Sequence, residues 1–145
     1  VRVINEEIGE RGWQPIVYRE RHHDHSEIRR YYRAADFCMV TSLHDGMNLV
    51  AKEFVAASSN DKGVLVLSRF TGAARELEQA LLVNPYDTVS FAEAFHQALT
   101  MQAEEQKARL ERMRLTVAEN NIYSWAQAIL TDVIRLAEDH STVNG

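Results

Sequence analysis

Short apolar runs alternate with helix-forming segments along the first 86 residues of the 145-residue chain. Runs of this kind, rich in branched and apolar residues, are typical of parallel strands that are buried on both faces. We predict four strands, at residues 16–19, 37–41, 64–67 and 81–83. Because helical patterns separate them, the sequence predicts an α/β fold in which helices cover a parallel sheet.

The helices are predicted from caps and from apolar residues at helical spacing. Residues 1–9 have the pattern of the last turns of a helix that ends at a glycine. Ser26 is expected to cap a helix that runs to about residue 34. Between the later strands we predict a helix at 48–58 and a short helix at 72–78.

From residue 87 onward the strand pattern is absent. Residues 87–145 are expected to form C-terminal helices at 89–101, 103–119 and 123–139. The last of these is amphipathic, so Trp125 and its apolar neighbours are expected to pack against the core. A part of this face that stayed exposed would favour self-association into a homo-oligomer.

Composition indicates one globular domain, because apolar residues make up 46% of the chain, which is enough to bury one core. Charge and hydropathy also exclude several classes of partner. The net charge of −5 gives no basic footprint for nucleic acid. No apolar run approaches the roughly 20 residues that span a bilayer. The single cysteine, Cys38, allows no internal disulfide and fits a reducing compartment, so we expect a cytoplasmic protein without nucleic acid or membrane partners.

Residues 45–53 join a predicted strand to a helix through a glycine and end in a carboxylate. Gly46 allows the backbone to approach a ligand closely. The first amide groups of the helix favour an anion such as a diphosphate. Glu53 comes about one turn into the helix, where a carboxylate can accept hydrogen bonds from two vicinal ribose hydroxyls. The segment therefore predicts a nucleotide-sugar site, although other doubly wound proteins also combine a strand, a glycine and a later acid.

Two other segments carry polar side chains that could bind a ligand. His22, His23, Asp24 and His25 are of metal-ligating types. Adjacent loop residues rarely point at one ion, so we expect a polar loop before a helix and no metal site. Residues 68–72 follow a strand at the same sheet edge as the glycine turn, and they either border its pocket or form an ordinary connection with an exposed arginine.

The run Asp45-Gly46-Met47-Asn48-Leu49-Val50-Ala51-Lys52-Glu53 resembles the donor-site signature of the trehalose-6-phosphate synthases, a family of retaining glycosyltransferases. Further segments resemble that family in the same order, and together they cover nearly the whole chain. They lie at 12–18, 32–36, 63–70, 72–77 and 82–87. His44 is a departure, because the family usually has arginine before the aspartate.

The resemblance implies a place within the two-domain GT-B fold. The chain would be the C-terminal part, the second half, of a Rossmann-like doubly wound donor domain, followed by a helical segment. In the strand order 3-2-1-4-5-6 the four predicted strands would be strands three to six. A gap would then separate residues 16–19 from residues 37–41. The acceptor domain and the first half of the donor domain would be absent from the chain.

The resemblance also implies a reaction. Such an enzyme transfers glucose from UDP-glucose to glucose 6-phosphate with retention and forms α,α-trehalose 6-phosphate and UDP, without a metal or another cofactor. The 145-residue chain alone would be inactive, since the acceptor site would lie outside it. Two alternatives remain, which are a glucosylglycerol-phosphate synthase and a non-catalytic module that binds a nucleotide sugar or serves assembly.

The resemblance assigns roles to seven residues of the signature and no nucleophile. Glu53 would hold the ribose hydroxyls of UDP-glucose. Asp45, with the backbone of Gly46 and Met47, would hold hydroxyls of the donor glucose. The start of the helix would offer main-chain contacts to the diphosphate, at Asn48, Leu49 and Val50.

Overall fold

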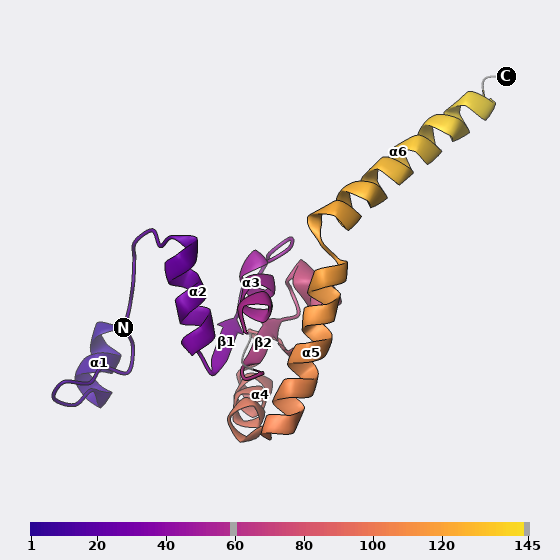
Figure 1. Ribbon diagram of the computed structural model, residues 1–145. Coiled ribbons are helices and arrows are strands. Elements are labelled where there is room, and N and C mark those ends of the chain that lie inside the picture. The colour runs from indigo at the N-terminus through magenta and orange to yellow at the C-terminus, as the bar shows by residue number, and fades with distance from the viewer. Residues whose placement is uncertain (59–60, 144–145) are drawn as a thin grey trace.

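A parallel three-stranded sheet lies at the centre of the protein (Figure 1). The structure, a computed structural model, describes residues 1–58 and 61–143. The strands are β1 (Phe37–Val40), β2 (Val64–Ser68) and β3 (Leu81–Val83), and they lie in the order β1-β2-β3. Three of the four predicted strands are thus confirmed.

The helices follow the predicted pattern closely. Before β1 lie α1 (Arg2–Ile8) and α2 (His25–Ala34). Between the strands lie α3 (Leu49–Ala57) and the 3-10 helix η1 (Gly72–Arg75), and after β3 come α4 (Thr88–Thr100), α5 (Ala103–Glu119) and α6 (Ile122–Val143). One predicted cap is wrong. Asp24, and not Ser26, caps α2, because its Oδ1 accepts a 2.9 Å hydrogen bond from the amide of Glu27, while Ser26 lies inside the helix.

Strand β2 is buried along its whole length and separates two apolar clusters. Its residues alternate, so that Leu65 and Leu67 pack with α3 and α5 on one face. Val64 and Val66 pack with α4 on the other face. Helices therefore cover both faces of the sheet, as predicted for an α/β fold with a doubly wound sheet.

Residues 16–19 do not form the predicted strand. They have no regular secondary structure, and Val17 and Tyr18 are 67% and 64% exposed. A strand forms only when it bonds to a neighbouring strand. Among the described residues, β1 is an edge strand and bonds to β2 alone. The backbone of Ile16 instead bonds to the side chain of Asn5, with contacts of 2.8 and 2.9 Å. Since residues 16–19 form no strand, the expected gap between two strands of one sheet stays a prediction.

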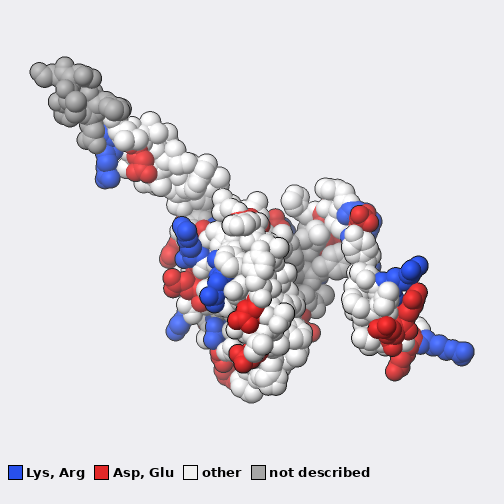
Figure 2. Space-filling model, turned by 180° about the vertical axis from the view of Figure 1, so that it is seen from behind, with Lys and Arg blue, Asp and Glu red and all other residues white. Residues whose placement is uncertain are grey.

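Contrary to the prediction, helix α6 does not pack against the core. It extends away from the sheet, and Figure 2 shows few charged side chains along the side of its described part that is in view. Trp125 is 57% exposed and Leu130 is 62% exposed. Helical spacing shows that one face is apolar but does not show what covers it. No helix among the described residues has the length and apolar character needed to cross a bilayer.

We expect Phe54→Ala to lower the free energy of unfolding by about 3–5 kcal/mol, because this fully buried ring fills the cluster between α3, α5 and the sheet. The matched change Trp125→Ala should alter it by less than about 1 kcal/mol, because the indole is largely exposed. Urea unfolding followed by circular dichroism measures both. Equal losses in the two variants would contradict the described position of α6.

Candidate functional site

The loops that follow β1 and β2 meet at the carboxyl edge of the sheet. Asp45 forms an isolated parallel bridge with Thr71. The amide of Gly72 donates to the carbonyl of Asp45 at 3.0 Å, and the amide of Ala73 donates to the carbonyl of Met47 at 2.7 Å. Backbone hydrogen bonds therefore join the predicted donor turn to the loop after β2.

The contact between these loops requires a glycine at position 72. A Cβ on Gly72 would lie 2.1 Å from the carbonyl oxygen of Gly46 and 3.2 Å from the Cα of Met47. Residues 68–72 thus contact the signature turn, and Arg69 is exposed, as in an ordinary connection. These residues line neither of the two pockets described below, so their border with a donor pocket stays a prediction. In contrast, a Cβ on Gly46 would meet no atom within 4 Å. Open space therefore lies beside Gly46, where the sequence predicts a close approach to a ligand.

Asp45 holds the turn through its side chain. Its Oδ2 accepts a 2.9 Å hydrogen bond from Nδ2 of Asn48, and its Oδ1 accepts a 3.1 Å bond from the amide of Met47. These two donors, Asn48 first, hold the pKa of the Asp45 carboxyl below its ordinary value. The carboxylate is thus ionised at neutral pH, and its remaining lone pairs can accept hydrogen bonds from ligand hydroxyls.

Asn48 starts the helix that follows the turn. Its backbone is left-handed, with φ 72°, and its side-chain Oδ1 caps the amide of Ala51 at 2.9 Å. The predicted start of the helix near this residue is confirmed. The amides of Leu49 and Val50 precede the capped one and have no acceptor one turn earlier in the helix. Both residues are exposed, at 60% and 45%, so this helix end is open to an anion.

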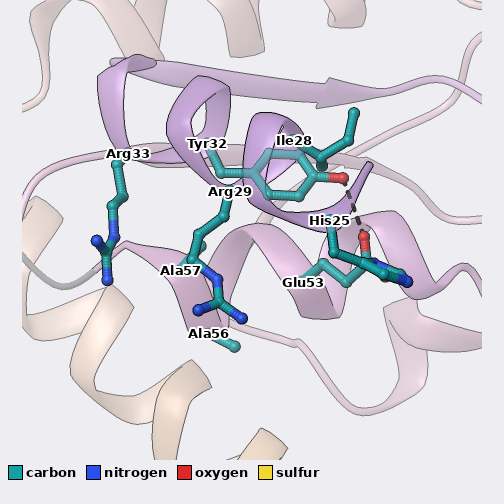
Figure 3. Close-up of a pocket in the computed structure, with 8 residues that line it drawn as sticks. All are labelled: His25, Ile28, Arg29, Tyr32, Arg33, Glu53, Ala56 and Ala57. Carbon is teal, nitrogen blue, oxygen red and sulfur yellow. Dashed lines mark hydrogen bonds between the residues drawn. The ribbon is translucent and has the colours of Figure 1, made fainter. Parts of the chain in front are cut away.

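Glu53 lies in a groove between α2 and α3. A pocket of about 360 Å³ is lined there by side chains of both helices, among them His25, Arg29, Tyr32 and Glu53 (Figure 3). The hydroxyl of Tyr32 donates a 3.2 Å hydrogen bond to Oε2 of Glu53. Burial, and then the nearby Glu53 carboxylate, raise the pKa of Tyr32 to about 12. Sequence reasoning missed this partner because 21 positions separate the two residues and no local pattern links them.

The seven predicted residues gather around the first turns of α3 but do not line one pocket. Met47 and Leu49 border a second pocket of about 580 Å³, which reaches Trp125 at the start of α6. An ion pair between Lys52 and Glu76, 2.8 Å long, lies along the same pocket. Neither of the two pockets is lined by the other four predicted residues, Asp45, Gly46, Asn48 and Val50.

The side chains of the histidine-rich segment at the start of α2 have different surroundings and do not converge on one point. Nδ1 of His23 lies 3.0 Å from Oε2 of Glu27, while Asp24 caps α2 and His25 lines the first pocket. Among the side chains that the structure describes, no group of three or more histidine, cysteine, aspartate or glutamate residues is placed to hold a metal ion.

We expect Gly72→Ala to lower the free energy of unfolding by about 2 kcal/mol or more, because its methyl group would overlap the backbone of Gly46. Gly46→Ala is the matched control. It should change stability by less than about 1 kcal/mol, because its methyl group has open space. Thermal unfolding of both variants measures the difference. A Gly72→Ala protein as stable as the parent would contradict the described contact between the loops.

Acid is expected to loosen the turn formed by residues 45–48. A carboxyl group with a lowered pKa in the folded state stabilises that state above its ordinary value, here 3.8, and this contribution is lost as the pH falls through the lowered pKa. The amide resonance of Met47, followed by NMR against pH, should therefore shift with a midpoint below 3.8. Asp45→Asn should remove the transition. A midpoint at or above the ordinary value would contradict the hydrogen bonds described for Asp45.

Comparison with known proteins places this architecture in a family. The sequence model of Glycosyltransferase family 20 matches residues 1–135. The trehalose-6-phosphate synthase of Citrobacter koseri is 47% identical over 131 residues, which cover 90% of this chain and 28% of that protein.

Solved structures agree with the sequence comparison. An E. coli protein bound with UDP-2-fluoro glucose is 44% identical and superposes with a TM-score of 0.83, over 88% of this chain and 29% of its own. The UDP-forming α,α-trehalose-phosphate synthase of Burkholderia xenovorans, in complex with glucose-6-phosphate, is 43% identical with a TM-score of 0.84, over 90% of this chain and 29% of its own. The chain spans less than a third of the length of these relatives. With its three-stranded parallel sheet and C-terminal helices, the chain belongs to glycosyltransferase family 20.

Proposed function

We propose that this chain forms part of the UDP-glucose site of a retaining glycosyltransferase. The whole enzyme transfers glucose from UDP-glucose to glucose 6-phosphate and forms α,α-trehalose 6-phosphate and UDP. The observation that carries the proposal is the turn at the carboxyl edge of β1, where Asp45 and Asn48 hold an open helix N-terminus with Glu53 about one turn beyond it. Relatives that bind a UDP-glucose analogue and glucose-6-phosphate support both substrates.

The proposed roles follow the positions of the groups along the turn. The amides at Asn48, Leu49 and Val50 approach the diphosphate, where the positive end of the α3 dipole favours negative charge. Because these donors are fixed before the reaction, they stabilise the charge that develops on the leaving diphosphate. Glu53 accepts hydrogen bonds from the two ribose hydroxyls.

At the other end of the donor, the glucose lies over the turn. Asp45 accepts hydrogen bonds from glucose hydroxyls with the lone pairs that Asn48 and Met47 leave free. The open space beside Gly46 admits the sugar against the backbone. These residues position the donor and exchange no proton or covalent bond with it, so none of them is assigned as a nucleophile.

We propose that the chain lies in the second half of the donor domain. We also infer that the chain alone does not catalyse glucose transfer. The relatives are more than three times as long. We assign the groups that bind the acceptor phosphate to the part of the relatives that this chain does not match. The 145 residues are therefore expected to bind UDP-glucose without releasing UDP from it in the presence of glucose 6-phosphate.

Glu53→Ala tests the donor role by isothermal titration of the chain with UDP-glucose. We expect the affinity to fall by about tenfold or more, because the ribose hydroxyls lose a charged acceptor. Glu104→Ala, which removes an exposed carboxylate in the first turn of α5, is the matched control and should bind as the parent does. Gly46→Ala should fold normally and bind UDP-glucose poorly. Unchanged affinity in both site variants would remove the turn from the proposed function.

A further inference from the structure

Glu53 owes its described position to a residue on another helix. Asp45 and Asn48 hold each other within the turn, but the hydrogen bond to Glu53 comes from Tyr32 of α2 (Figure 3). The neighbouring cation, Lys52, points to Glu76, which its Nζ approaches to 2.8 Å. The orientation of the Glu53 carboxylate therefore depends on how α2 presents its tyrosine.

The ring of Tyr32 is held firmly. It makes an edge-to-face contact with the ring of Phe54, with centroids 6.2 Å apart and planes at 81°, and Phe54 is fully buried. This packing sets the phenol oxygen within hydrogen-bond distance of Glu53 on α3. Because the pKa of Tyr32 is raised to about 12, the hydroxyl keeps its proton at neutral pH and acts as a donor to the carboxylate.

A glutamate at an exposed helix position otherwise samples many rotamers, and fixing it on a ligand costs conformational entropy. The bond from Tyr32 restricts this freedom before the ligand arrives. It occupies one lone pair of Oε2 and leaves Oε1 and a second lone pair open, which is enough acceptor capacity for a vicinal diol.

We propose that Tyr32 is a positioning residue of the donor site, whose hydroxyl orients the Glu53 carboxylate toward the two ribose hydroxyls of the nucleotide. The inference rests on the proposed function, because it assumes the ribose role of Glu53. It assigns Tyr32 to ribose recognition alone, so the diphosphate and glucose contacts do not depend on its hydroxyl.

The test measures binding of UDP and of 2′,3′-dideoxy-UDP to the 145-residue chain by isothermal titration. Tyr32→Phe keeps the ring against Phe54 and removes only the hydroxyl. We expect its affinity for UDP to fall about three- to tenfold, as for the loss of one hydrogen bond, while its affinity for the dideoxy nucleotide stays the same. Tyr31→Phe is the matched control. It removes a hydroxyl that donates to Glu27 on the same helix, and it should leave both affinities unchanged.

A double-mutant cycle separates the inference from the proposed function. In a Glu53→Ala background, which removes the acceptor of the Tyr32 hydroxyl, Tyr32→Phe should cause no further loss of UDP affinity, because the two residues act through one contact. Equal losses for both nucleotides, or no loss for UDP, would overturn the positioning role while leaving the donor site in place. A parent chain that binds both nucleotides equally would instead remove the ribose role of Glu53, and the role of Tyr32 would fall with it.

Discussion

The burial of β2 on both faces is the constraint on which the rest of the structure depends. A strand without a solvent face needs helices on each side of the sheet and a partner strand at each edge. The chain meets these needs with α3 and α5 on one face, α4 on the other, and β1 and β3 as neighbours. Because the strands are parallel, their following loops emerge at a common edge, and the signature turn lies there for this reason.

The elements that could be predicted from sequence are those specified by local signals. An apolar run, a glycine and an asparagine cap define β1, the turn and α3 within a few positions, and no distant residue is needed to recognise them. Residues 16–19 have strand character, but a strand forms only beside another strand, and that information is not local. The apolar face of α6 is equally visible in the sequence, whereas its exposure depends on what packs against it.

The same distinction applies to the site. Its seven signature residues could be found because they are contiguous, and the structure gathers them around the start of α3. Their roles toward a ligand remain proposals. Gly72 and Tyr32 act on that segment from positions far away in sequence. Only the fold shows that the first must lack a Cβ for the loops to meet and that the second reaches Glu53.

Asn48 limits how the signature can vary. Its left-handed backbone favours glycine, asparagine and aspartate. Its cap of Ala51 requires a short side chain with an acceptor, which glycine lacks. Its side-chain nitrogen, Nδ2, also donates a hydrogen bond to Oδ2 of Asp45. An aspartate at this position would lack that donor and would place two carboxylates side by side. Asparagine meets all three requirements, whereas glycine and aspartate each fail at least one, so we expect either replacement at this position to weaken the turn.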